Sequence, residues 1–230
     1  MDFIFMLTRN DCTVEAPLRV LERVRPLGLR HIGFKDIGAS RSEMAALVAG
    51  IKASGATSYM EVVSTDAEDC LRSARLARDL EIDCLLGGTQ VGKILSILGG
   101  SRTRYFPFPG RPLGCPTRLA GTPIEVEAQC RSFMEKGCAG ADVLAYRATE
   151  ADPLDLVAAA RRGLGEKGFL IVAGSVSTPE QVRLLRSAGA NAFTIGSAVF
   201  DLTFKPGADS IEEQLKAILS VCSDDAVESA

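Results

Sequence analysis

Short apolar runs alternate with longer segments of helical period along the whole chain. Eight runs rich in Val, Ile and Phe predict strands. They lie at residues 3–7, 31–34, 58–63, 82–86, 104–108, 141–146, 169–173 and 192–195. Neighbouring runs are roughly 20 to 30 residues apart, which leaves room each time for one crossover helix and two short loops. The pattern is typical of βαβ units and a parallel sheet.

The segments between these strands carry apolar stripes with the period of a helix. They lie at residues 16–27, 40–54, 67–80, 91–98, 122–136, 153–164, 178–188 and 211–221. Several begin with a start signal, such as Thr178-Pro179, and several are followed by a glycine, such as Gly189, where a left-handed C-cap is favourable. Eight evenly spaced units predict an α/β fold of one domain, a closed (β/α)8 or TIM barrel over residues 1–222. Residues 223–230 are small and acidic, and we expect a flexible tail there.

A doubly wound open sheet is the main alternative fold, because it shows the same alternation of strands and helices. Its first strand is normally followed by a glycine-rich turn that binds a dinucleotide. Segment 8–12, which follows the first predicted strand, contains no glycine. No P-loop motif occurs elsewhere in the chain, so a nucleotide-binding sheet is disfavoured and the barrel is preferred.

The charge distribution points to a small-molecule partner. The 230 residues carry a formal net charge of −3, with acidic and basic positions interspersed, so no basic field exists to attract nucleic acid. No polybasic amphipathic segment indicates membrane binding, and the N-terminal apolar run is too short for a signal peptide. With 47% hydrophobic residues, the chain has enough apolar material for a full core.

The cysteines and the single histidine limit the chemistry. The seven cysteines are odd in number and scattered without a CxxC pair, which favours reduced thiols and a cytoplasmic location. His31 is the only histidine, so the usual zinc sites and most Ser-His and Cys-His schemes are excluded. It begins its strand at the face of the barrel that serves stability, and we interpret it as structural. Acid–base chemistry then falls to carboxylates, lysine or tyrosine.

Two strand ends near the C-terminus close on the same dipeptide. Gly174-Ser175 follows the seventh predicted strand and Gly196-Ser197 follows the eighth. Glycine lets backbone N–H groups approach an anion, and the serine hydroxyl adds a donor. In (β/α)8 enzymes the loops after strands 7 and 8, with a short extra helix, commonly bind phosphate. The extra helix is expected over 197–200, although tight turns alone are the competing interpretation of these glycines.

Segment 169–200 resembles the ribulose-phosphate-binding barrel superfamily, which includes sugar-phosphate epimerases and decarboxylases. The shared pattern is an apolar strand before Gly174, the stretch 177–181, and the stretches 189–192 and 195–198. Many members have Gly-Gly at the seventh strand end, where Ser175 replaces the second glycine. The resemblance implies a phosphorylated ligand, with Gly174, Ser175, Gly196 and Ser197 as its cradle.

Charged side chains at the second and third strand ends are the candidate catalytic groups. Lys35 and Asp36 follow the second strand, and alternation along a strand sends only one of them into the barrel, for which we prefer Lys35. Glu61 interrupts an apolar strand, so it needs a partner, and Lys35 on the adjacent strand is the expected one. A purely structural ion pair is the competing interpretation.

Further residues at the catalytic face are candidate substrate contacts. Arg147 follows the sixth strand, where a guanidinium suits a carboxylate or a second phosphate. Asn10 ends the first strand, next to Asp11, which either binds substrate or caps the following helix. Gly87 and Gly88 form another glycine-bearing strand end. The long loop 107–121, rich in proline and glycine and containing Cys115, is either a lid or a static edge.

These observations predict an enzyme that acts on a small phosphorylated metabolite. We expect a sugar-phosphate isomerase, an epimerase or a lyase that works through an enolate, without a cofactor, with Lys35 and Glu61 carrying protons and Asp36 beside them. Such barrels often pair, so a homo-oligomer is expected. Two alternatives remain open: a non-catalytic barrel that senses a phosphorylated metabolite, and a Mg²⁺-dependent aldolase or lyase with Asp36 and Glu61 as metal ligands.

Overall fold

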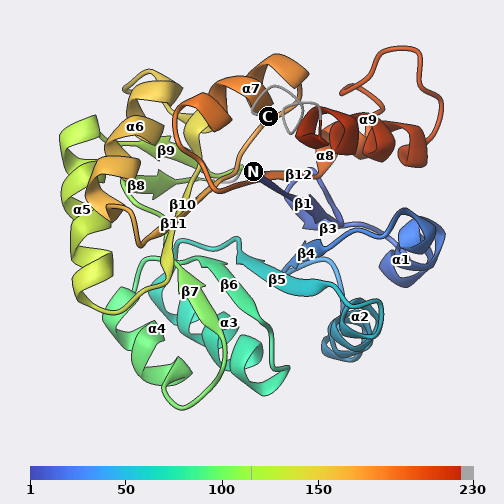
Figure 1. The fold of residues 1–230 in the computed structure, drawn as a ribbon. Coiled ribbons are helices and arrows are strands. Elements are labelled where there is room, and N and C mark those ends of the chain that lie inside the picture. Colours follow the sequence, from blue (N-terminus) through green and yellow to red (C-terminus); the bar gives the residue numbers. More distant parts are fainter. Residues whose placement is uncertain (115, 224–230) are drawn as a thin grey trace.

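Eight parallel strands form a barrel in the computed structural model, which describes residues 1–114 and 116–223 (Figure 1). The barrel strands are β1 (Asp2–Met6), β4 (His31–Lys35), β5 (Thr57–Val62), β6 (Cys84–Gly87), β7 (Arg104–Phe106), β10 (Gly140–Val143), β11 (Phe169–Val172) and β12 (Ala192–Ile195). They are ordered β10-β11-β12-β1-β4-β5-β6-β7. Main-chain hydrogen bonds of 3.0 Å from Ala139 to Tyr105 and from Asp142 to Pro107 join the two edge strands. The predicted single-domain (β/α)8 barrel is confirmed.

Helices surround the strands in chain order (Figure 1). They are α1 (Pro17–Val24), α2 (Arg41–Ala53), α3 (Ala67–Asp79), α4 (Val91–Leu98), α5 (Pro123–Glu135), α6 (Pro153–Leu164), α7 (Pro179–Ser187) and α9 (Ile211–Ser223), with the short α8 (Ser197–Phe200) and the 3-10 turns η1 (Arg25–Leu27) and η2 (Ala145–Arg147). Several begin where capping chemistry predicts. At α7, for example, the Thr178 hydroxyl accepts from the backbone N–H of Gln181, and the Gln181 side chain reaches back to the backbone N–H of Thr178.

Two short antiparallel hairpins lie at the carboxyl end of the barrel. The first pairs β2 (Thr8–Arg9) with β3 (Cys12–Thr13), and the second pairs β8 (Arg111–Leu113) with β9 (Arg118–Ala120). The second hairpin occupies the predicted loop 107–121. The fifth strand ends at Phe106 rather than at residue 108. Pro107 and Pro109 have no backbone N–H with which to continue the hydrogen bonds of the sheet. The sixth strand ends at Val143, and η2 replaces its predicted last residues.

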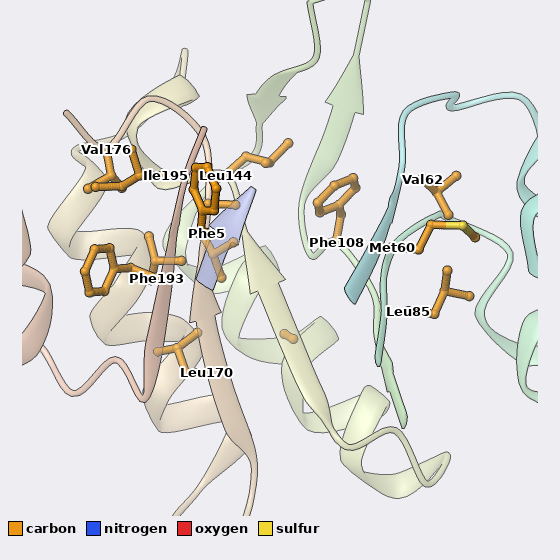
Figure 2. Close-up of a cluster of buried hydrophobic side chains, with 14 of the residues drawn as sticks. Phe5, Met60, Val62, Leu85, Phe108, Leu144, Leu170, Val176, Phe193 and Ile195 are labelled. Atoms are coloured by element: carbon orange, nitrogen blue, oxygen red, sulfur yellow. The ribbon is translucent and has the colours of Figure 1, made fainter. Parts of the chain in front are cut away.

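The core has two parts, as expected when strand side chains alternate between faces. A large cluster fills the layer between the strands and the helices, and Figure 2 shows part of it, including Phe5, Met60 and Leu85. A smaller cluster fills the barrel interior: Ile4, Met6, Tyr59, Cys84, Leu86, Phe106, Ile171 and Ala192. The interior is therefore a packed core.

Some expectations fall partly outside the described residues. Cys115 does so, and so does the expected tail except for Ser223, which ends α9. The six described cysteines are all free thiols. His31 lies at the amino end of β4, where its Nδ1 is 3.1 Å from the Tyr59 hydroxyl. No helix in the described part of the chain is long and apolar enough to cross a membrane.

Candidate active site

A cavity of about 250 Å³ opens at the carboxyl end of the barrel. Its lining includes Asp11, Lys35, Glu61, Arg147, Gly174, Ser175, Thr194, Gly196 and Ser197. The structure thus brings together the two predicted catalytic side chains Lys35 and Glu61 and all four predicted cradle residues. The volume lies near the lower end of the range for ligand sites, which suits a small metabolite.

Lys35 lies between two carboxylates. Its Nζ is 2.7 Å from Oδ1 of Asp11 and 3.0 Å from Oε1 of Glu61. The three side chains are only 7% to 8% exposed. The partnership of Lys35 with Glu61 follows from the sheet, because these two residues are paired in register on β4 and β5. The expected Lys35–Glu61 pair is present, and Asp11 is its third member.

Asp11 reaches the barrel through the β2–β3 hairpin. Asn10 and Asp11 form its two-residue turn with φ values of 50° and 59°. Both central residues of a type I′ turn need positive φ, a conformation that Asn and Asp tolerate better than most side chains. Helix α1 begins after Ala16 without a side-chain cap. The interpretation of Asp11 as a helix cap is therefore wrong, and Asp11 belongs to the cavity.

Arg147 holds Asp11 from the other side. Its Nη1 is 2.8 Å from Oδ2 of Asp11 and its Nη2 is 2.9 Å from Oδ1, a bidentate pair that fixes the orientation of the carboxylate. Arg147 also donates to the Thr117 carbonyl at 3.3 Å and to the Ser175 hydroxyl at 3.4 Å. The guanidinium thus links the acidic side of the cavity, the β8–β9 hairpin and the glycine-serine loop after β11.

The network keeps Asp11 and Lys35 charged near neutral pH. Burial opposes ionisation of Asp11, but Arg147 and Lys35 outweigh it and lower the pKa of the carboxyl. Burial likewise opposes the charged form of Lys35, but Glu61 and Asp11 outweigh it and raise the pKa of the ammonium. Lys35 is therefore a cation and hydrogen-bond donor in this site, not a neutral amine.

The loops after β11 and β12 carry the four predicted cradle residues. Gly174 and Ser175 both have positive φ, 81° and 66°. This backbone conformation explains why a second glycine suits the position of Ser175. A Cβ on Gly196 would lie 2.3 Å from Oγ1 of Thr8 and 2.6 Å from its carbonyl oxygen, so only glycine fits there. Ser197 begins α8, and its Oγ accepts from the Asn10 backbone N–H at 3.2 Å.

Four predicted site residues lie outside the cavity: Asp36, Gly87, Gly88 and Asn10. Asp36 points away from the barrel interior, because its oxygens accept from the Val63 backbone N–H at 3.0 Å and from the Ser73 hydroxyl on α3. Its burial raises the pKa of the carboxyl. The catalytic assignment of Asp36 is therefore wrong, and so is the Asp36–Glu61 pair as a metal site. Within the described residues, no group of three or more His, Cys, Asp or Glu could hold a metal ion.

Gly87 and Gly88 serve packing. A Cβ on Gly87 would lie 2.6 Å from the Phe108 ring, and a Cβ on Gly88 would lie 2.9 Å from Ile94. Neither lines the cavity, so their assignment to substrate binding is wrong. Asn10 also lies outside the lining; its backbone N–H connects the hairpin to Ser197.

The β8–β9 hairpin is tied to its surroundings. Arg111 forms ion pairs with Glu125 of α5 and with Glu150, the latter at 2.8 Å. The backbone N–H of Thr149 donates to the Leu119 carbonyl at 2.9 Å. These contacts hold the base of the hairpin, while the Thr117 carbonyl near its tip contacts Arg147.

Two interior residues were missed by the sequence analysis. Thr194 of β12 lines the cavity between the cradle and Lys35. Asp142 of β10 is fully buried. A carboxylate that interrupts an apolar strand had singled out Glu61, and the same criterion applies to Asp142 between Ala141 and Val143. Applied consistently, it would have found this residue.

Replacing the cradle glycine should weaken anion binding. In Gly196→Ala the new Cβ meets the Thr8 backbone, so the loop must shift, and we expect inorganic phosphate to bind at least about tenfold more weakly by calorimetry. Ser197→Ala, which removes only a donor, should also weaken binding by about tenfold and should fold normally. Gly92→Ala on α4, where a Cβ meets nothing within 4 Å, is the control. Wild-type phosphate affinity in both cradle variants would contradict the assignment.

Lys35→Met should destabilise the protein because it leaves two buried carboxylates without their cation. We expect the free energy of unfolding to fall by about 3 to 5 kcal/mol at pH 7 in urea titrations. Lys52→Met, which removes a lysine that is 37% exposed, should cost less than about 1 kcal/mol. Equal losses in the two variants would contradict the central place of Lys35.

The pH dependence of that loss follows from the pKa shifts. The Asp11 contribution is present above the ordinary value of 3.8 and is lost as the pH falls through its lowered pKa. The Lys35 contribution is present below the ordinary value of 10.5 and is lost as the pH rises through its raised pKa. The difference in stability between wild type and Lys35→Met should therefore be largest between these two values and shrink toward either extreme.

Comparisons with known proteins show the fold. No family model matches the chain, and no curated protein matches its sequence. Orotidine 5'-phosphate decarboxylase from Pyrococcus horikoshii OT3 superposes with a TM-score of 0.67 and 12% identity, covering 95% of this chain and 98% of the decarboxylase. A native KDPGal structure gives a TM-score of 0.66 and 11% identity, with 97% of both chains covered.

An oxidase also shares this architecture. A mandelate oxidase mutant with a monooxide FMN adduct superposes with a TM-score of 0.63 and 13% identity, covering 97% of this chain and 72% of the oxidase. Identities this low establish the architecture and leave the reaction to the residues of the site. The chain is similar to these proteins in its (β/α)8 fold, which agrees with the predicted architecture.

Proposed function

We propose that the chain is an enzyme that binds a small phosphorylated metabolite and moves a proton on the carbon next to its carbonyl group. One observation carries the proposal: the glycine-serine cradle and the Lys35–Glu61 pair line the same cavity. A ligand held by its phosphate at Gly174 and Gly196 would extend toward the carboxylate of Glu61. Orotidine 5'-phosphate decarboxylase, which shares the fold, is named for a phosphorylated substrate, and this supports the choice of ligand.

The cradle supplies binding and orientation. Backbone N–H groups in the loops after β11 and β12 suit phosphate oxygens, and the hydroxyls of Ser175 and Ser197 add donors. Anchoring the phosphate restricts the rest of the substrate to the cavity and holds the reacting carbon near the barrel axis. Arg147 fixes Asp11, which in turn fixes the ammonium of Lys35. In this arrangement Arg147 and Asp11 position Lys35. Arg147 would also contact a second acidic group of the substrate.

Glu61 and Lys35 divide the chemistry between them. The carboxylate of Glu61 takes a proton from the carbon beside the carbonyl, and the electron pair of that C–H bond moves into a C–C double bond. The carbonyl oxygen becomes an enolate oxygen, whose negative charge the Lys35 ammonium stabilises. Protonation of the enolate carbon from solvent on the other face gives epimerisation. Isomerisation follows when the neighbouring hydroxyl group gives its proton to the enolate oxygen and the former carbonyl carbon takes the proton from Glu61. In a lyase reaction Glu61 instead takes the proton of a substrate hydroxyl group, the C–C bond breaks with its electron pair forming the same enolate, and the other fragment leaves as an aldehyde.

The charge state of Lys35 argues against a covalent mechanism. A Schiff base requires a neutral amine, which enzymes obtain by lowering the lysine pKa. Glu61 and Asp11 raise the pKa of Lys35 instead. The proposal therefore uses Lys35 as an electrostatic partner of the enolate oxygen. A metabolite-sensing barrel needs no such pair, and the placement of Lys35 and Glu61 inside the cavity favours the enzyme over the sensor.

Solvent-deuterium exchange tests the reaction without knowledge of the final product. A panel of aldose and ketose phosphates is incubated with the protein in D2O and followed by proton NMR. We expect loss of the signal from the carbon-bound proton next to the carbonyl in at least one compound. Glu61→Gln should slow this exchange by about 100-fold or more, because the base is lost, while phosphate still binds.

Asp36→Asn is the matched control for Glu61→Gln. It neutralises an acid next to Lys35 in sequence but outside the cavity, and an amide oxygen can still accept from the Val63 N–H. Exchange should proceed at the wild-type rate. Phosphate binding without exchange in any member of the panel would overturn the proposed reaction and favour the sensing barrel. Equal rates in Glu61→Gln and wild type would remove Glu61 as the base.

A further inference from the structure

Asp142 places a carboxyl group inside the barrel beneath the cavity. It is paired in register with Ile171 of β11, a member of the interior cluster, so its side chain shares that face of the sheet. Its backbone N–H donates to the Pro107 carbonyl at 3.0 Å and helps to close the barrel. The residue therefore occupies a fixed position on the seam between β7 and β10, at the level of the interior core.

The carboxyl group of Asp142 is buried without a hydrogen-bond partner. Its exposed fraction is 0%, and no atom of the described residues hydrogen-bonds either oxygen. An ionised carboxylate in such surroundings is very costly, whereas the protonated acid is far less so. Its burial and the charge of Glu61 raise the pKa of Asp142 well above its usual range, against the opposing effect of Lys35.

The charges around the cavity balance without Asp142. Lys35 and Arg147 provide two cations, and Asp11 and Glu61 provide two anions. The remaining charged residue of the lining, Asp201, is paired with Arg9 at 2.7 Å. These four groups, carried by β4, η2, the β2–β3 turn and β5, are the charged residues of the network. An additional anion in the interior would leave the network with excess negative charge and would compete with Glu61 for Lys35. The balance therefore favours a neutral Asp142.

We propose that Asp142 is a buried, protonated acid that positions the charge of this site: by staying neutral, it leaves the Lys35 ammonium paired with Glu61. Its role in catalysis rests on the proposed function, whereas its protonation does not. It is a positioning residue, because it does not line the cavity and acts on the substrate only through Glu61. An apolar side chain there would remove the dipole of the acid from the surroundings of Glu61.

The protonation state is tested by stability against pH. If Asp142 keeps its proton on folding and releases it on unfolding, wild type binds one more proton when folded than when unfolded between pH 5 and about pH 7. The folding equilibrium constant of wild type relative to Asp142→Asn should then fall about tenfold for each pH unit. Asp36→Asn is measured in parallel as a comparison, because Asp36 is a partly buried carboxyl whose oxygens have hydrogen-bond partners. A ratio for Asp142→Asn that does not change with pH would overturn the proposal.

Infrared spectroscopy gives an independent readout of the same proton. The difference spectrum between wild type and Asp142→Asn at pH 7 should contain the carbonyl band of a protonated carboxylic acid. Carboxylate bands in its place would show that Asp142 is ionised and would overturn the proposal. Neither measurement uses a substrate, so failure of the proposed reaction leaves this test intact.

Deuterium exchange then separates a positioning role from a catalytic one. Asp142→Asn replaces a neutral acid by a neutral amide, so exchange at pH 7 should remain within a few-fold of wild type. Asp142→Val removes the polar group altogether, so its exchange rate should fall below that of Asp142→Asn while phosphate still binds. Loss of exchange in Asp142→Asn to the level of Glu61→Gln would make Asp142 the base itself and would overturn the positioning role.

Discussion

The ammonium group of Lys35 is the interaction on which the candidate site depends. It lies within 3.0 Å of both Asp11 and Glu61 in a part of the barrel that is nearly closed to solvent. Without it, two carboxylates would face each other away from water, which costs more than a typical surface ion pair could return. The same charge that makes the cluster tolerable would stabilise an enolate oxygen. The positive charge of Lys35 therefore serves both the stability of the site and its proposed chemistry.

The parallel barrel explains how distant parts of the chain meet this group. The carboxyl ends of parallel strands share one rim, so residues from the start, middle and end of the chain line one cavity. Asp11 enters on a tight hairpin, Arg147 on the turn after β10, and Ser175 and Ser197 on the loops after β11 and β12. Arg147 contacts both Asp11 and Ser175. This contact connects the acidic end of the cavity to the cradle.

The sequence predicts those parts of the site that depend on local chemistry. The Gly-Ser strand ends and the Lys35–Glu61 pair follow from backbone requirements and strand alternation, and both are found in one cavity. The sequence places Asp36 and Gly87 in the site, whereas the structure places them outside it. The contacts that hold them there involve residues distant in sequence, Ser73 for Asp36 and Phe108 for Gly87. Asp11 depends on a two-residue turn with positive φ, which no apolar pattern announces. Asp142 is a single acid in a short strand, and its burial depends on the closure of the barrel.

A crystal structure with phosphoglycolohydroxamate, a phosphorylated mimic of an enolate, tests the proposed roles of the cradle, Lys35 and Glu61 most directly. The phosphate group should contact the backbone N–H groups at Gly174–Ser175 and Gly196–Ser197. A hydroxamate oxygen should lie within hydrogen-bond distance of the Lys35 Nζ, with the carboxylate of Glu61 facing the mimicked carbon. A phosphate bound elsewhere, or a hydroxamate directed away from Lys35 and Glu61, would contradict these roles.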